Sequence, residues 1–378
     1  MIFLNQQPVE VIDLYKNYLK SVGTLSKLFS DSPIPLIHYR VVENIFCKVF
    51  NAENLAREDS AYDAKKGSLG IGIKTFTFES NTKLEKIAEF NRLSAYLREL
   101  KGEALLLRLS ELRNQRIEFA NNNYNIHSAI YHCVSRKENL FRIFEVDYDI
   151  IDIEKLSGLK ITDKSISFHD GKSEYSFLFS KSTLFRKFHQ PLEYIDVPVE
   201  IAKEPFEILL QLYETLNLQP KIQRAGIDYV ILPLYSLRES KSNNKKVAEK
   251  SGLNQWNAGG RKRDLGEVYI PIPQIIHQVC PSFFPPRDKT FLLKIPSGEI
   301  LTAKLCQENS KALMTNPNNA LAEWILRKIL KLSEGELLTY ERLSFLGVDS
   351  MKVSKVTDNE YYIDFAEVDS FEDFLEKI

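Results

Sequence analysis

GLNQWNAGGRKRDLGEVYIPIP, residues 252–273, places a loop of polar, aromatic and cationic side chains directly before an apolar alternating run. Gly259 and Gly260 loosen the loop, and residues 268–273 predict a β-strand that holds it. Amides pair with adenine edges and arginines with guanine edges or phosphates, so the loop suits nucleic-acid recognition. A solvated hairpin loop that is basic by chance is the alternative interpretation. The polar and aromatic candidates are Asn254, Gln255, Trp256 and Asn257, and the cations are Arg261, Lys262 and Arg263.

The charge distribution is more informative than the formal net charge of −1. Lys and Arg outnumber Asp and Glu between residues 238 and 263, whereas the last forty or so residues are rich in acids. Such asymmetry is typical of a basic binding face with an acidic region held elsewhere. The acidic end is expected to be a solvated terminal helix, with shielding of a groove as the alternative.

The bulk properties favour two domains, which we expect at residues 1–200 and 201–378, because 378 residues can bury two medium cores. The sequence has no run of about 18 apolar residues, so no membrane span is predicted, and the N-terminus lacks the pattern of a signal peptide. Four cysteines lie far apart in apolar surroundings, which indicates reduced core thiols in a cytoplasmic protein. They are Cys47, Cys133, Cys280 and Cys306.

Candidate catalytic residues lie in the N-terminal half, after two predicted helices at residues 9–28 and 37–50. Asp63 precedes a Gly-containing turn in AYDAKKGSLGIGIKTF, and Lys74 lies on the predicted strand that follows. We expect a helix over residues 82–100 that carries Glu85 and Glu89. Carboxylates that hold Mg²⁺ and a lysine that orients water are what phosphodiester hydrolysis requires. Glu43, on the second helix, is either a surface acid or a further acid near the metal.

The C-terminal half resembles the DNA-recognition domain of restriction endonucleases of the NgoFVII and BfiI kind. The resemblance covers residues 227–329 and rests on the opening stretch, on FFPPRDKTFLLKI (283–295) and on CQENSKALMTNPNN (306–319), in that order. It implies a B3-like open β-barrel whose two loops, residues 253–264 and 307–319, enter the major groove. The second loop carries Asn309, Lys311, Thr315, Asn316, Asn318 and Asn319. Arg287 and Lys289 are candidates for phosphate contacts, with a salt bridge to Asp288 as the alternative.

Residues 40–91 resemble PD-(D/E)XK restriction endonucleases, with one departure. The acid that usually stands two positions before the lysine is Gly72 here. Some enzymes of this kind supply the missing carboxylate from the following helix, which favours Glu89 and, second, Glu85. The resemblance implies that Asp63, Glu89 and the carbonyl of Ile73 hold Mg²⁺.

The rest of the chain predicts supporting structure. Turn residues separate hairpins at residues 128–146, 165–179, 291–305 and 352–365. Ser180 and Lys181 either contact phosphates or begin a capped short helix. Three prolines place the interdomain connection at residues 190–205. His127 and His132 are either general bases or structural histidines of the sheet.

These features together predict an α/β, mixed-sheet, restriction-endonuclease-like domain followed by a mainly β, B3-like open pseudobarrel. The function that the resemblances imply is that of a cytoplasmic, Mg²⁺-dependent type II restriction endonuclease acting on double-stranded DNA. Because both strands must be cut, we expect a homodimer or two protomers that meet on DNA. The alternative is a DNA-binding protein with a degenerate nuclease domain. A phospholipase-D-like nuclease is disfavoured because no HxK motif with its downstream partner is present.

Overall fold

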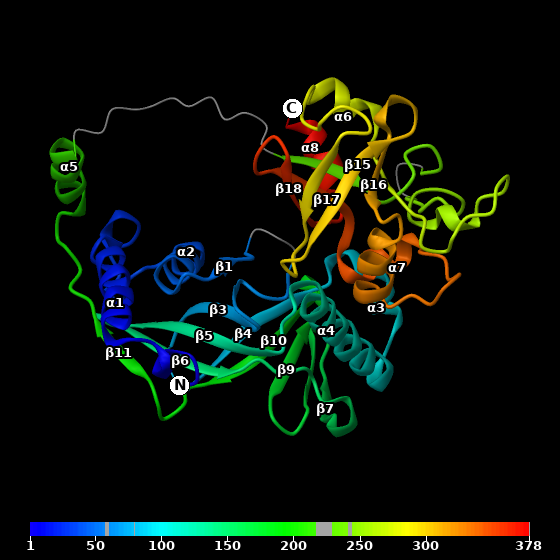
Figure 1. The fold of residues 1–378 in the computed structure, drawn as a ribbon. Helices are drawn as coiled ribbons and strands as arrows, with labels where there is room; N and C mark the ends of the chain where they lie inside the picture. The colour runs from blue at the N-terminus through cyan, green and yellow to red at the C-terminus, as the bar shows by residue number, and fades with distance from the viewer. Residues whose placement is uncertain (57–59, 79, 217–228, 241–243, 378) are drawn as a thin grey trace. The chain divides into compact units, whose positions relative to one another are not determined.

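The computed structural model describes residues 1–56, 60–78, 80–216, 229–240 and 244–377. The chain divides into two compact units, which are described separately (Figure 1). Unit 1 comprises Met1–Ile117 and Ile126–Ile222, and unit 2 comprises Glu118–Asn125 and Gln223–Ile378. The long helix α4 (Gly102–Tyr124) therefore contributes its last residues to unit 2.

Unit 1 contains a mixed six-stranded sheet in which β3 and β5 are parallel and the other neighbours are antiparallel. In sheet order the strands are β1 (Glu53–Asn54), β2 (Ala64–Lys66), β3 (Leu69–Thr77), β5 (Ser128–Lys137), β6 (Leu140–Asp147) and β11 (Ile195–Pro198). Helices α1 (Val9–Thr24) and α2 (Tyr39–Phe50) cover one face (Figure 1). On this face Ile71 and Ile73 of β3 share a buried core with Tyr15 and Phe46 of the two helices.

A second, five-stranded antiparallel sheet belongs to the same unit. Its order is β4 (Thr82–Glu89), β10 (Thr183–His189), β9 (Glu174–Leu178), β8 (Ser165–His169) and β7 (Ser157–Ile161). The ring of Phe188 on β10 contacts Phe76 of β3 and Tyr131 of β5, with centroids 5.9 and 5.0 Å apart. An aromatic layer therefore joins β10 to the six-stranded sheet. Shorter helical segments are η1 (Leu4–Gln6), η2 (Ser26–Leu28), η3 (Asn91–Leu93), α3 (Ser94–Glu99), η4 (Ile153–Lys155), η5 (Phe179–Lys181) and α5 (Pro205–Leu216).

Two expectations for this half of the chain are wrong. Residues 82–89 form a strand and not a helix, because β10 pairs with them along their whole length and sets Glu85 opposite Arg186. Such cross-strand pairing overrides local helix preference. The segment 190–205, where the interdomain connection was expected, contains β11, which pairs with β6, and unit 1 continues to Ile222.

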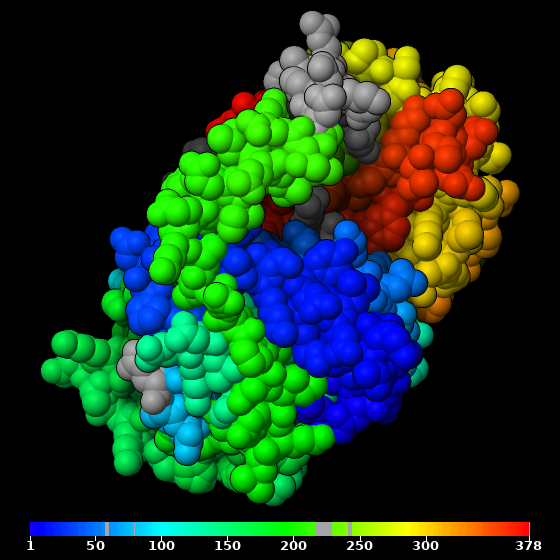
Figure 2. Space-filling model, turned by 90° about the vertical axis from the view of Figure 1, so that its left-hand side faces the viewer, coloured from blue at the N-terminus to red at the C-terminus, as the bar shows by residue number. Residues whose placement is uncertain are grey.

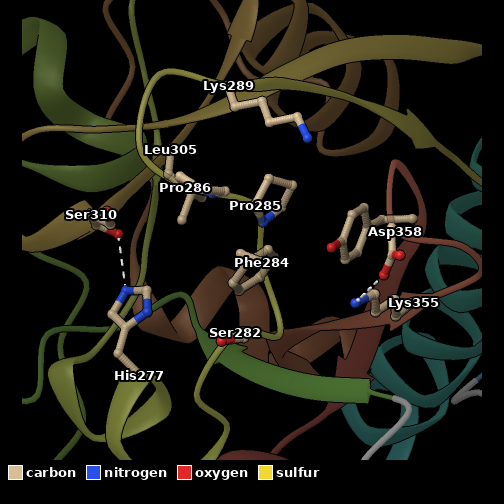
Figure 3. A pocket seen from close by; sticks show the side chains of 11 residues that line it. His277, Ser282, Phe284, Pro285, Pro286, Lys289, Leu305, Ser310, Lys355 and Asp358 are labelled. Atoms are coloured by element: carbon tan, nitrogen blue, oxygen red, sulfur yellow. Dashed lines mark hydrogen bonds and ion pairs between the residues drawn. The ribbon is translucent and has the colours of Figure 1, made fainter.

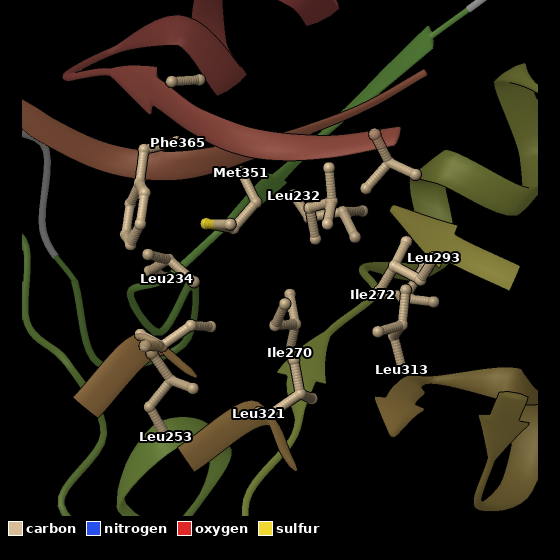
Figure 4. Close-up of a cluster of buried hydrophobic side chains, with 14 of the residues drawn as sticks. Leu232, Leu234, Leu253, Ile270, Ile272, Leu293, Leu313, Leu321, Met351 and Phe365 are labelled. Atoms are coloured by element: carbon tan, nitrogen blue, oxygen red, sulfur yellow. The ribbon is translucent and has the colours of Figure 1, made fainter. Parts of the chain in front are cut away.

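Unit 2 is built on a seven-stranded sheet that is nearly closed and barrel-like. In sheet order the strands are β12 (Tyr229–Pro233), β17 (Val348–Lys355), β18 (Glu360–Glu367), β14 (Thr290–Lys294), β15 (Ile300–Cys306), β16 (Ala312–Asn316) and β13 (Ile270–Pro271). The two edge strands, β12 and β13, lie close to each other. Side chains such as Leu232, Ile270 and Met351 point into one apolar interior (Figure 4). The expected hairpins at residues 291–305 and 352–365 are confirmed.

Helical segments complete unit 2. They are η6 (Gly252–Asn257), α6 (Gln274–Val279), η7 (Glu308–Ser310), the π-helix η8 (Ala322–Ile329), α7 (Tyr340–Leu346) and α8 (Ser370–Glu376). Trp324 and Ile325 of η8 are buried in the barrel core. The acidic end of the chain forms α8, and Phe371 and Phe374 anchor it in the core.

Candidate active site and nucleic-acid interface

The β2–β3 hairpin fixes the carboxylate of Asp63 beside the strand that carries Lys74. The Oδ2 atom of Asp63 accepts a hydrogen bond from the backbone N–H of Ile73 at 2.6 Å, and its own N–H donates to the carbonyl of Ile71 at 2.9 Å. The carboxylate of Asp63 is therefore held beside the backbone of Ile73, the residue that precedes Lys74.

Glu43 of α2 joins this group although its carboxylate is only 3% exposed. Burial raises its pKa, and the negative charge of Asp63 raises it further, whereas Arg40 and Lys74 oppose the shift. Arg40 donates to its Oε2 atom at 3.1 Å. Glu43 is therefore a buried acid, not a surface acid, and its charge interacts with those of Asp63 and Lys74. A role near a metal stays a prediction.

The charge of Lys74 acts on Glu85 of β4. Burial raises the pKa of Glu85, and the positive charges of Lys83, Lys74 and Arg136 oppose the shift. Glu89 is exposed and forms an ion pair with Lys86 at 2.8 Å. The two acids are four residues apart on β4, which is about 13 Å in a strand. The sequence-based preference for Glu89 over Glu85 assumed that residues 82–100 form a helix, in which both side chains would have lain on one face.

Aromatic rings fill the place of the acid that is missing at Gly72. A Cβ atom there would lie 2.7 Å from Cε2 of Tyr148 and 2.9 Å from Cδ1 of Tyr131. The two rings stack with centroids 4.1 Å apart, and the ammonium of Lys74 lies 5.9 Å from the Tyr131 centroid. Arg113 of α4 donates to the Tyr131 hydroxyl at 3.2 Å. Sequence reasoning missed these tyrosines, because only the pairing of β3 with β5 brings Tyr131 beside Gly72.

The donors of this site suit Mg²⁺ but do not form a complete protein cage. Among the described residues, no group of three or more His, Cys, Asp and Glu side chains is arranged to hold a metal ion. Mg²⁺ commonly takes one or two carboxylates and completes its shell with water and phosphate oxygens. Asp63 and Glu43, whose charges act on each other, fit that use. The carbonyl of Ile73 lies on β3, next to Lys74.

The two histidines have different surroundings. His132 is fully buried, and its Nε2 atom lies 2.9 Å from the hydroxyl of Tyr15. Its Nδ1 atom lies 3.6 Å from the carboxylate of Glu145. This position suits the structural alternative. His127 is exposed just before β5.

The first loop of the candidate nucleic-acid interface is partly interior. Asn254 is 1% exposed, and its side chain donates to the carbonyl of Leu338 at 2.8 Å and accepts from the Leu338 N–H at 2.9 Å. Gln255 is also buried and donates to the carbonyl of Glu267. Both amides are thus used to fix the loop, contrary to the expectation that they face a ligand. Trp256 is half-buried, and Asn257 is exposed.

The cations of this loop are nearer to solvent. Arg261 and Lys262 are exposed, and Arg261 forms an ion pair with Glu267. Arg263 is half-buried and donates to the carbonyl of Ala258. Gly260 adopts φ +104°, which a residue with a side chain rarely adopts, so the turn between the amides and the cations requires glycine.

The second loop presents exposed amides at the end of β15 and around β16. Exposed candidates are Asn309, Lys311, Asn316, Asn318 and Asn319. Thr315, in contrast, is fully buried, and its hydroxyl accepts from the N–H of Leu321. Asn309 has φ 58°, within a tight turn. Apart from Thr315, the candidates on this loop lie where a ligand can reach them.

A pocket of about 500 Å³ adjoins the second loop through Ser310 (Figure 3). Its lining includes Lys289 and Lys355, and Lys355 forms an ion pair with Asp358 at 2.9 Å. Arg287 is exposed and forms an ion pair with Asp288, as the salt-bridge alternative anticipated.

Ser180 and Lys181 are exposed in η5 of unit 1. They lie before β10, so a short helix does begin here but does not continue over residues 183–188. Both side chains remain available for a phosphate contact.

Comparison with known proteins identifies the barrel. Residues 231–357 match the family model of the NgoFVII C-terminal B3-like DNA-binding domain. The match covers about a third of the chain, includes both loops and supports the recognition-domain resemblance. No curated protein matches the chain. Within the described residues, no helix has the length and apolar character needed to cross a membrane.

Proposed function

We propose that the chain is a sequence-specific, Mg²⁺-dependent endonuclease of the type II restriction kind that hydrolyses phosphodiester bonds in double-stranded DNA. The observation that carries this proposal is the Asp63 carboxylate, held at 2.6 Å by the N–H of Ile73 next to Lys74, in a chain whose other unit matches a B3-like DNA-binding domain. The charges of Asp63 and Lys74 also act on Glu43, and that of Lys74 acts on Glu85. The exposed amides and cations of the two loops bind the duplex, and unit 1 cleaves it.

The residues of unit 1 would have the following roles in hydrolysis. Asp63 and Glu43 would hold Mg²⁺, which would supply positive charge against the negative charge that builds on the phosphate. Lys74 donates hydrogen bonds that orient the attacking water. Water attacks phosphorus, the bond to the leaving oxygen breaks, and a nearby base takes the proton from water. Glu85 suits this last role because its raised pKa brings it closer to neutral pH than an ordinary glutamate.

A cleavage assay on unmethylated phage DNA tests the proposal. The purified full chain is expected to give discrete bands with Mg²⁺ and intact DNA with EDTA. Lys74→Ala and Glu85→Gln should each lower the cleavage rate by at least about 100-fold, because each removes a group that acts on the water, while DNA affinity persists.

Glu89→Gln is the matched control, because it changes the same residue type on the same strand, about 13 Å away. It should cleave at nearly the wild-type rate. If Glu89→Gln were as impaired as Glu85→Gln, the assignment of Glu85 would be wrong.

The second candidate function is that of a sequence-specific DNA-binding protein without activity. The filled space at Gly72 favours it, because the acid of the usual nuclease pattern has no room there. Under this function, wild-type protein would shift a specific duplex in a gel yet leave it uncut with any divalent cation. Lys74→Ala would then have no cleavage to abolish.

A further inference from the structure

Helix α5 exposes an unusual amount of apolar surface. Seven of its large apolar side chains are between 37% and 66% exposed: Phe206, Ile208, Leu209, Leu210, Leu212, Tyr213 and Leu216. A helix of a globular protein normally buries such side chains against a core. Here the main contact of α5 with another helix or strand among the described residues is with η2, and Phe29, directly after η2, is exposed as well. Figure 2 shows this bright green segment standing on the surface beside the blue N-terminal residues.

The helical repeat separates α5 into a narrow polar stripe and a wide apolar face. At about 100° per residue, Glu207, Gln211, Glu214 and Thr215 fall within a stripe of about 100°. The apolar residues occupy about 200° of the remaining circumference, with Leu209 at the middle of that face and Leu212 about 60° from the middle, still within it. The helix therefore has an apolar surface that is wide enough for a partner helix.

The charges of α5 restrict what this partner can be. Its two charged residues are Glu207 and Glu214, and it carries no Lys or Arg. Helices that lie on membrane surfaces carry Lys and Arg on their polar face, and DNA attracts cations. An apolar, weakly acidic helix fits neither surface. It does fit a copy of itself, because an antiparallel pair joins the two apolar faces and keeps both polar stripes in water.

We propose that α5 is a self-association surface through which two copies of the chain pair as antiparallel helices. Twelve residues make a helix about 18 Å long, and one pair of such helices falls short of the roughly 800 Å² per partner of a standard interface. The association is therefore weak in the free protein and strengthens when one duplex holds two copies. This last step rests on the proposed function, since cutting both strands requires two active sites.

Sedimentation of the full chain in EDTA, over a range of concentrations, tests the proposal without reference to cleavage. Wild-type protein should self-associate with rising concentration, and cognate duplex should increase the fraction of pairs. Leu212→Glu should weaken the self-association at least about tenfold, because it places a charge within the apolar seam. Leu192→Glu, which changes the same residue type at a fully exposed site of unit 1, should leave it unchanged.

A cysteine variant covers the case in which Leu212→Glu fails to fold. Leu209→Cys should form a disulfide-linked pair under mild oxidation, and Leu192→Cys should not. Wild-type protein that stays monomeric with and without DNA would overturn the proposal. Equal behaviour of Leu212→Glu and Leu192→Glu would do the same. Because these readouts need no catalysis, α5-dependent pairing would stand even if the protein cut no DNA.

Discussion

Gly72 has no side chain, and this makes room for the rings of Tyr131 and Tyr148. Gly72→Ala places a Cβ atom within 3.0 Å of both rings and should destabilise unit 1 by about 1–3 kcal/mol through overpacking. Urea unfolding followed by circular dichroism measures this. Gly259→Ala is the control, because that position faces open space. Equal stability of the two variants would show that the rings move aside at no cost.

The closeness of Asp63 to the strand of Lys74 could be predicted from the sequence, because both belong to one hairpin, where spacing along the chain determines spacing in the fold. The surroundings of Glu85 and Glu89 could not be predicted, since they depend on the pairing of β4 with β10, far along the sequence. Asn254 shows that residue type alone does not reveal whether a side chain is available to a ligand. Its residue type suits base recognition, but only the fold reveals that both its donor and its acceptor are already bound to Leu338.

The segment that leads into the first loop is tied to α8 and β17 by a single ammonium group. The Nζ atom of Lys245 lies within 2.9 Å of carboxylate oxygens of Asp349, Asp369 and Glu372, and the Asp349 side chain is fully buried. These hydrogen bonds raise the pKa of Lys245. The acidic end of the chain therefore anchors this basic segment, which goes beyond the solvated helix that charge alone predicted.

Lys245→Met keeps most of the side-chain length but removes the charge, leaving a buried carboxylate without its cation. We expect a loss on the order of 3 kcal/mol in the free energy of unfolding of unit 2. Tryptophan fluorescence can report it, because both tryptophans, Trp256 and Trp324, belong to this unit. Lys328→Met serves as reference, since its ion pair with Glu299 is exposed and should be worth less than about 1 kcal/mol. Similar losses in the two variants would refute the anchoring role.

Hairpins were the elements that the sequence predicted best, because turn residues and alternating strands are local signals. Residues 290–306 and 348–367 pair as expected, with Gly298 in one turn. The strand over residues 82–89 was not predicted, because it lacks such local signals. KLEKIAEF has no alternation strong enough to identify it, and its partner strand lies about a hundred residues away in the chain.

The division of the chain into two units does not follow a single cut in the sequence, because residues 118–125 belong to unit 2. Asp364, 1% exposed, accepts hydrogen bonds from Asn123 at 2.9 Å and from Tyr124 at 2.7 Å. Phe119 packs edge-on against Phe365 in the same core. A DNA-binding fragment that begins at residue 223 would lose these partners, although it would contain all the residues that match the B3-like family.

We therefore expect Asp364→Asn to have opposite effects in the two contexts. In the full chain it weakens hydrogen bonds to a buried carboxylate and should cost about 1–3 kcal/mol. In the fragment of residues 223–378 the carboxylate has lost two of its donors, so the same change should be neutral or stabilising. Urea unfolding read by tryptophan fluorescence gives both values. A fragment as stable as unit 2 in the full chain, with the same response to Asp364→Asn, would mean that the end of α4 is not required for the barrel.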